Sequence, residues 1–185
     1  MLMAIIQRHP SHCDSLLSLS DACRLQDDSQ SAKELLERLL FVMESSLHPR
    51  CVIGNGKNRF DYKRPENRPF FGGLFRYCQL SAQRGCWRTA LEQAKLLLSF
   101  DPTDPLAVVL LIPLFAVRSG KFEELIEMES ELNYRNVESL PNWSLSISLA
   151  LIHLNRIEEA RLKLKQCLID HPALLFPLLE KMQGN

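Results

Sequence analysis

The sequence predicts an all-α protein, a tetratricopeptide-like helical-repeat solenoid of about four antiparallel helix pairs with an insertion loop near residues 48–66. Outside that loop, apolar residues recur at intervals of three and four, and no strand-like alternation of any length competes with them. The turn-forming residues Gly85, Gly120 and Asn155 are spaced by 35 residues, each between an apolar segment and an amphipathic one. A period close to 34 residues is typical of tetratricopeptide-like helix pairs.

Other positions repeat with these turns. A small or apolar residue follows each turn by five positions: Ala90, Leu125 and Ala160. Small side chains there let two helices approach closely. Asp27 and Ala32 keep the same relation near the N-terminus, but Asp27 precedes Gly85 by 58 residues, which is one period plus 23. An insertion of about that length therefore separates the first helix pair from the second.

These intervals predict a single helical-repeat domain over residues 1–185. Its helix pairs are expected at about 12–47, 67–99, 104–132 and 142–170, with the insertion at 48–66. The individual helices are expected at 12–25 and 29–47, 67–83 and 86–99, 104–119 and 121–132, and 142–154 and 156–170. A final helix at 172–182 would cap the array. Gly72–Gly73 should weaken its helix by about 1 kcal/mol per glycine, and Pro113 should kink another.

The composition is that of an ordinary globular chain. Hydrophobic residues make up 46% and charged residues 24%, with a formal net charge of zero. The apolar run 105–117 is shorter than the roughly 20 residues that cross a bilayer, and the N-terminus lacks a signal-peptide pattern. We therefore expect no membrane partner and no secretion, and a location in the cytosol, the nucleus or both. The six cysteines have no metal-ligand spacing and indicate reduced thiols.

No residue pattern indicates catalysis. The acidic pairs Asp27–Asp28, Glu123–Glu124 and Glu158–Glu159 recur where second helices begin, so helix capping and solvation explain them better than acid–base chemistry. The cluster of His9, His12 and Cys13 lacks a fourth ligand at zinc-site spacing. We expect no enzyme activity, no metal, no cofactor and no small-molecule substrate.

The insertion and its flanks are unusually basic. Residues 50–88 contain nine basic and two acidic residues, a local net charge of +7, so the rest of the chain carries −7. Such asymmetry indicates an interaction surface, although a solvated linker remains an alternative. In RFDYKRPENRPFF, residues 59–71, the aromatic side chains should dock part of the segment on the helices while the cations stay available.

Eight residues are therefore candidates for partner binding. They are Arg59, Tyr62, Lys63, Arg64 and Arg68, with Arg84, Trp87 and Arg88 extending the same basic face. Cations interleaved with aromatic residues suit the phosphates and exposed bases of RNA, or an acidic protein patch. The charge alone does not decide between these two.

Four segments resemble the conserved central region of the transcription factor 25 family, also called ribosome quality control complex subunit 1 proteins: HPSHCDSLLSLSDACRLQDD, FDYKRPENRPFF, RGCWRTALEQAKLLLSFDPTDPLAVVLLI and LPNWSLSISLA. The similarity runs over nearly all of this chain. Members of that family are much longer, so we expect this chain to be a fragment or a short isoform.

The resemblance implies a non-enzymatic adaptor that acts beside the Listerin-type ubiquitin ligase on stalled large ribosomal subunits. It would support ubiquitination and proteasomal clearance of nascent chains, and ribosomal RNA would be one candidate partner of the basic insertion. Two alternatives stay open, a nuclear DNA-binding transcriptional regulator and an inert repeat scaffold. Against the first, Pro65 and Pro69 interrupt the basic segment, whereas a DNA-reading basic region is a continuous helix.

Overall fold

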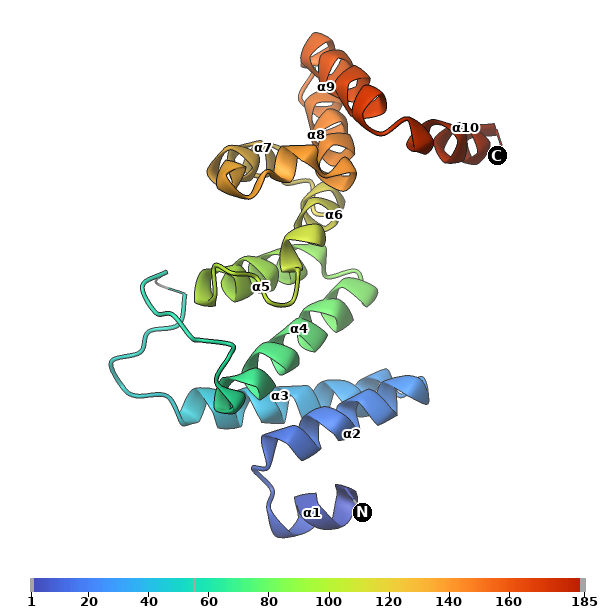
Figure 1. The fold of residues 1–185 in the computed structure, drawn as a ribbon. Coiled ribbons are helices and arrows are strands. Elements are labelled where there is room, and N and C mark those ends of the chain that lie inside the picture. Colours follow the sequence, from blue (N-terminus) through green and yellow to red (C-terminus); the bar gives the residue numbers. More distant parts are fainter. Residues whose placement is uncertain (1, 55, 184–185) are drawn as a thin grey trace. The chain divides into compact units, whose positions relative to one another are not determined.

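Helices make up the regular structure of the computed structural model, which describes residues 2–54 and 56–183; these ranges contain no strand (Figure 1). The chain packs as two compact units, Met1–Val109 and Leu110–Asn185. The first contains α1 (Leu2–Arg8), α2 (Cys13–Leu25), α3 (Ser29–Ser45), α4 (Arg68–Gln83) and α5 (Trp87–Phe100). The second contains α6 (Ile112–Arg118), α7 (Phe122–Glu131), α8 (Pro141–His153), α9 (Ile157–Asp170) and α10 (Leu175–Gln183). The all-helical prediction is confirmed for the described residues, and the single-domain organisation stays a prediction.

Short 3₁₀ helices connect several of these elements, at Pro65–Asn67, Val108–Leu110, Asn133–Arg135, Val137–Ser139 and Pro172–Leu174. Helix α1 has no counterpart in the predicted pattern; its Ile6 packs with Leu16 of α2 and Leu39 of α3. Among the helices of the described ranges, none combines the length and the hydropathy that crossing a bilayer requires.

All four helix pairs turn through the same backbone geometry. The φ angles are 58°, 80°, 72° and 59° at the four turn residues Asp27, Gly85, Gly120 and Asn155. In each turn the next residue donates its N–H to the carbonyl five positions earlier, as Cys86 does to Ser81 and Lys121 to Ala116, both over 2.9 Å. These bonds satisfy carbonyls that the helix end leaves open. The predicted register of the turns is confirmed.

The position five residues after each turn is buried, as the repeat requires. Ala32, Ala90 and Leu125 have no exposed surface, and Ala160 is 3% exposed. Each of these residues lies in the first turn of a second helix, and that helix packs against the first helix of its own pair. A small side chain at this position allows the close approach that the spacing predicted.

The first helix of the third pair is shorter than predicted. Residues 104–111 form turns and a 3₁₀ helix, and α6 covers only Ile112–Arg118. Asp104 and Ala107 both have a φ of 52°, a left-handed conformation that interrupts an α-helix. The Asp104 carboxylate also accepts the N–H groups of Val108 and Val109, at 2.7 and 2.9 Å. Pro113 lies in the first turn of α6, where no N–H is needed, so the predicted kink was wrong.

Two glycines let α4 pack closely on the first helix pair. Gly72 and Gly73 are buried within α4. A Cβ atom added to Gly73 would lie 2.5 Å from Cδ2 of Leu39, and one added to Gly72 would lie 3.1 Å from Cδ2 of Leu17. The weak helix propensity expected of this pair is real, but the absence of side chains is what allows α4 to contact α3 and α2.

Replacing Gly73 by alanine should destabilise the first unit by about 1 kcal/mol. The added methyl overpacks against the fully buried Leu39, at a cost of about 1–3 kcal/mol. Better helix propensity offsets about 1 kcal/mol of that cost. The free energy of unfolding, measured by urea denaturation and by amide exchange in α4, checks this. The double variant Gly73→Ala/Leu39→Ala should lose less stability than the sum of the two single variants; additive losses, or a more stable Gly73→Ala protein, would contradict the packing role.

Candidate functional site

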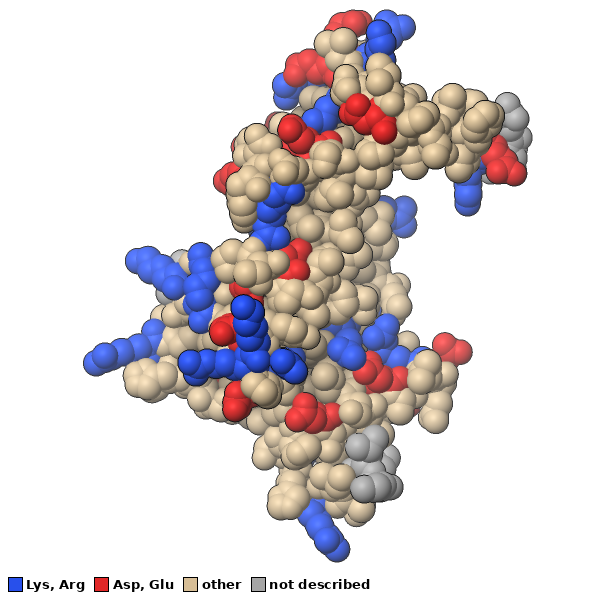
Figure 2. Space-filling view, in the orientation of Figure 1, with Lys and Arg blue, Asp and Glu red and all other residues tan. Residues whose placement is uncertain are grey.

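Residues 46–64 connect α3 to the 3₁₀ helix before α4, and we call this segment the strap. Its described residues, 46–54 and 56–64, form turns and irregular backbone but no helix. Gly54 and Gly56 adopt positive φ angles of 86° and 67°, which glycine adopts without strain. Lys and Arg side chains gather on the side of the molecule where the strap lies (Figure 2). The predicted insertion is therefore a cationic, non-helical segment of the first unit.

The aromatic rings of the strap face the helices. The Phe60 ring centroid lies 4.8 Å from that of Phe100 in α5 and 5.8 Å from that of Phe70 in α4. Tyr62 meets Phe71 edge to face, with centroids 5.4 Å apart and an interplanar angle of 86°. Edge-to-face pairs of this kind stabilise packing beyond the area that they bury. Docking of the segment through its aromatic residues is thus present in the structure.

The strap also caps the C-terminal end of α5. The Phe60 N–H donates to the carbonyl of Phe100 over 3.0 Å. The Arg59 guanidinium donates through Nη1 to the carbonyls of Ser99 and Gly56, both at 2.6 Å. The last carbonyls of a helix have no partner within the helix, and a cation there interacts favourably with the helix dipole. Arg59 and Phe60 therefore hold the strap in place.

Asp101, directly after α5, fastens the next part of the strap. One carboxylate oxygen accepts the N–H of Tyr62 at 3.3 Å, and the other accepts the N–H and the hydroxyl of Thr103 at 2.9 and 2.7 Å. Burial raises the pKa of the Asp101 carboxyl, but the hydrogen bonds from Thr103 and Tyr62 and the nearby Lys63 ammonium outweigh burial and lower that pKa below its ordinary value. The side chain is only 8% exposed, so its negative charge depends on these partners.

Replacing Asp101 by alanine should loosen the strap while the helices persist. The Tyr62 N–H loses its acceptor, so amide exchange at Phe60 and Tyr62 should accelerate at least tenfold, while protection within α2 and α3 changes little. Because the folded pKa is lowered, the stabilisation exists above the ordinary Asp pKa of about 3.9 and disappears as the pH falls through the folded value. Relative to exchange in an unfolded peptide at the same pH, the wild-type strap should therefore lose protection below about pH 4. A strap equally protected in the variant would contradict the fastening role.

Lys63 and Arg64 are the predicted site residues that project from the docked strap. Both are exposed, and they occupy a tight turn organised by Asp61. Asp61 accepts the Lys63 N–H on its carboxylate at 2.8 Å and the Arg64 N–H on its carbonyl at 3.2 Å. The Asn67 side chain donates to the same carbonyl at 2.9 Å. Their backbone is therefore held in place while their charged ends reach solvent.

The Arg68 side chain, by contrast, packs against the strap and binds its backbone. Its guanidinium lies 5.8 Å from the Tyr62 ring centroid and donates to the carbonyls of Tyr62 and Lys63, both at 3.3 Å. Tyr62 itself is half-buried against Phe71. Of the four strap residues predicted to bind a partner, Arg59 and Tyr62 thus shape the strap, and so does Arg68 at the start of α4. Partner binding by these residues stays a prediction.

The remaining three candidates, Arg84, Trp87 and Arg88, surround the turn between α4 and α5. Arg68 begins the 16-residue helix α4 and Arg84 follows its end, so the two are about 24 Å apart along the helix. Near Arg84, the hydrogen bond from the Tyr77 hydroxyl (2.9 Å), helped by Lys33 and Arg84, lowers the pKa of the Glu37 carboxyl. These three residues therefore lie near the end of α4 that is remote from the strap, and their role in binding stays a prediction.

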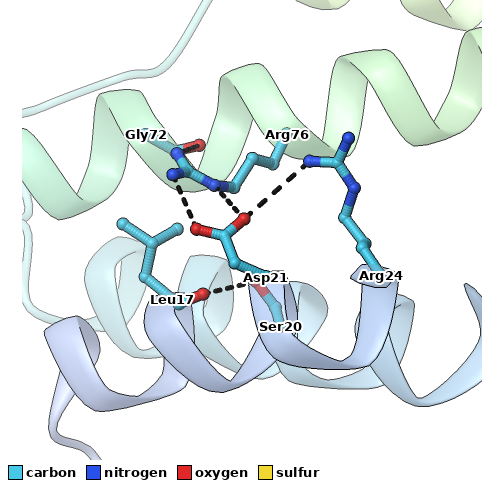
Figure 3. Close-up of polar contacts among 6 residues, drawn as sticks. All are labelled: Leu17, Ser20, Asp21, Arg24, Gly72 and Arg76. Atoms are coloured by element: carbon cyan, nitrogen blue, oxygen red, sulfur yellow. Dashed lines mark hydrogen bonds and ion pairs between the residues drawn. The ribbon is translucent and has the colours of Figure 1, made fainter. Parts of the chain in front are cut away.

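One further cation of the basic segment has an internal partner. Arg76 of α4 donates from Nε and Nη2 to the two carboxylate oxygens of Asp21 in α2, at 2.6 and 2.7 Å (Figure 3). Asp21 also lies 3.8 Å from Arg24. Two parallel hydrogen bonds give this ion pair a fixed geometry. The pair links α2, which precedes the strap along the chain, to α4, which follows it. The Arg76 charge is therefore already neutralised by Asp21 and is not available to a partner.

Sequence reasoning missed the residues on which the strap rests. Ser99 was expected only as the last residue of a helix, and Phe100 and Asp101 only as part of the break that follows, because about 40 residues of chain separate them from the strap. The one available signal was the pair of prolines in DPTDP, residues 101–105, which marks a turn whose first aspartate accepts hydrogen bonds locally.

The sequence model of one protein family, Transcriptional repressor TCF25, matches residues 1–185. The chain belongs to this family. A human protein named "Ribosome quality control complex subunit TCF25" is 41% identical over 193 residues, covering 97% of this chain and 29% of the human protein. "Ribosome quality control complex subunit 1" of Schizosaccharomyces pombe is 36% identical, covering 83% of this chain and 24% of the relative. "Probable transcription factor claV" of Ampulloclitocybe clavipes is 34% identical, covering 84% and 21%.

This TCF25 family chain therefore spans less than a third of the length of these relatives. Among solved structures, a crystal structure of nearly identical TPR-like repeats from Podosopora anserina matches with a TM-score of 0.62 at 16% identity. The match covers 93% of this chain and 82% of that one. At such low identity the likeness concerns the fold alone, and it confirms the predicted tetratricopeptide-like repeat for this member of the TCF25 family.

His12 and Cys78 of this TCF25 family chain have structural surroundings. Across the described ranges, no group of three or more His, Cys, Asp or Glu side chains is placed to hold a metal ion. His12 instead accepts the Ser15 N–H at the start of α2, over 3.2 Å. Burial raises the pKa of the Cys78 thiol to about 12, and a thiol that stays protonated at neutral pH is a poor nucleophile.

Proposed function

We propose that this chain is a non-enzymatic adaptor segment of the ribosome quality control machinery. It would support ubiquitination and proteasomal clearance of nascent chains on stalled large ribosomal subunits. The observation that carries the proposal is that relatives named as subunits of the ribosome quality control complex align with 83–97% of the chain. Helical repeats also present extended surfaces for partners. The proposed partners are a Listerin-type ubiquitin ligase and the large subunit, in the cytosol, the nucleus or both.

Affinity purification tests this function. The tagged chain, expressed in human cells, should co-purify with large-subunit proteins and the ubiquitin ligase, and more strongly when translation is stalled. An unrelated tetratricopeptide protein of similar size and charge is the matched control. A bait that is folded by circular dichroism yet retains neither large-subunit proteins nor the ligase above this control would overturn the proposal.

A second candidate, a DNA-binding transcriptional regulator, is favoured by the family's description and by the name of the Ampulloclitocybe clavipes relative. The basic strap is not helical, so binding through it would not use a continuous basic helix in the major groove. Selection from a random duplex library at physiological salt separates the two functions. Enrichment of one duplex sequence by the purified chain would favour the regulator over the adaptor.

A further inference from the structure

We propose that the strap binds the phosphodiester backbone of an RNA without reading its bases, chiefly through Lys63 and Arg64. This inference rests on the proposed function, because a factor acting on large ribosomal subunits meets RNA there. The strap is the contacting surface, and the phosphate groups of the RNA are its ligand. The inference comes from separating the cations that the fold uses internally from those that it presents to solvent.

Three arginines of the basic segment are bound within the fold. Arg59 binds carbonyls at the end of α5, Arg68 binds carbonyls of the strap, and Arg76 pairs with Asp21. Lys63 and Arg64 project instead, and the exposed Arg50 lies earlier in the same strap. Adjacent exposed cations such as Lys63 and Arg64 suit the negative charges of a nucleic-acid backbone.

The aromatic residues of the strap are half-buried against the helices, so the projecting cations, more than the rings, are placed to contact a ligand. Phe60 packs its ring against Phe70 and Phe100, and the Tyr62 ring meets Phe71 on one side and the Arg68 guanidinium on another. Proteins that stack RNA bases need an exposed aromatic face. Contact through the strap is therefore electrostatic and independent of base identity.

The groove beside these cations disfavours an acidic peptide as the ligand. A groove of about 750 Å³ runs between the strap and residues 100–105, with Phe60, Phe100 and two prolines in its wall. Asp61 and Asp101 line the same groove, together with Arg59 and Lys63, so the groove itself carries both signs of charge. An acidic peptide that buried apolar side chains there would bring its carboxylates towards both aspartates, whereas a backbone that touches only the projecting cations avoids them.

The turn around Asp61 prepares Lys63 and Arg64 for binding. Three hydrogen bonds of 2.8–3.2 Å to Asp61 hold the backbone of this turn, as described above. A surface that is already ordered loses less conformational entropy when it binds. Contact with phosphates through these two residues therefore does not require the strap to fold first.

Binding of the purified chain to oligo-uridylate, oligo-adenylate and poly-glutamate, each over a range of salt concentrations, tests the inference. The variant Lys63→Gln/Arg64→Gln removes the two projecting charges. The matched control Arg161→Gln/Lys165→Gln removes two exposed charges from α9. Point substitution is preferable to deletion of the strap, because deletion would also remove the cap on α5 and the Phe60 anchor.

Both RNAs should bind equally, and the variant should bind each about tenfold more weakly at physiological salt. Its plot of log affinity against log salt should be shallower by about 1.4, or about 0.7 for each phosphate that the variant no longer neutralises. The control variant should match wild type. A preference between the two RNAs, tighter binding of poly-glutamate than of RNA, or an unchanged salt slope in the variant would each overturn the inference.

The two proposals fail separately. In one outcome, the chain co-purifies with large subunits while substitution of Lys63 and Arg64 leaves its affinity for RNA unchanged. That result would overturn the inference and would not affect the adaptor function. A chain that binds RNA as expected but captures no quality-control component would support the inference's chemistry and overturn the function.

Discussion

Replacing Phe100 by alanine should lower the stability of the first unit by about 3–5 kcal/mol. Phe100 is 1% exposed and its ring contacts those of Phe60, Phe70 and Phe71, at centroid distances of 4.8, 5.4 and 6.4 Å. Truncation would leave a cavity at the centre of this aromatic cluster and remove the seat of the strap. The loss should therefore affect the helix packing and the docking of the strap together.

Amide exchange resolved by segment measures this loss, because a chain of two units need not unfold in one step. Peptides from α4, α5 and the strap should lose protection in Phe100→Ala. The matched control is Phe41→Ala in α3, whose ring is 71% exposed and whose removal should change stability by less than about 0.5 kcal/mol. Equal effects of the two substitutions would contradict the central place of Phe100.

Trp143→Ala should have a similar effect, about 3–5 kcal/mol, in the second unit. Trp143 has no exposed surface and lies in α8, the helix that packs against α6, α7 and α9. Trp87 of the first unit is the other tryptophan of the chain, so fluorescence of the variant reports on that unit alone. The amide exchange rates in α8 and α9 should rise by several orders of magnitude.

The aromatic control for this unit is Phe176→Ala in α10, where the side chain is 77% exposed. Its substitution should leave protection in α8 and α9 unchanged, because almost no buried surface is lost. A loss below about 1 kcal/mol for Trp143→Ala, or a comparable loss for Phe176→Ala, would mean that α8 is not the centre of the second unit.

The repeat could be predicted from the sequence because its signals are local. A left-handed turn residue, a buried small residue five positions later and an apolar face each reflect contacts within one helix pair. Asp27, Gly85, Gly120 and Asn155 accordingly all have positive φ. The third pair departs from the pattern because Asp104 and Ala107 also adopt positive φ, a feature that the apolar run over 105–117 conceals.

The candidate site could be predicted only in part. The sequence indicated a basic insertion docked by aromatic residues, and both features are present. It did not separate Arg59 and Arg68, whose guanidinium groups bind backbone carbonyls, from Lys63 and Arg64, which project. All four residues are exposed cations with similar neighbours along the chain, and only their partners in space distinguish them.

The sequence alone thus determines the order of the helices, the residues of the turns and the charge imbalance. Each of these depends on residue types and on neighbours within a few positions. Which cations remain for a partner depends on the folded backbone, since Arg59 binds the carbonyl of Ser99, 40 residues away, and Arg68 binds the carbonyls of Tyr62 and Lys63 in the docked strap. Those contacts exist because α5 returns antiparallel to α4 and brings its open carbonyls beneath the strap. Folding therefore converts some of the basic residues into structural caps and leaves the others as a surface.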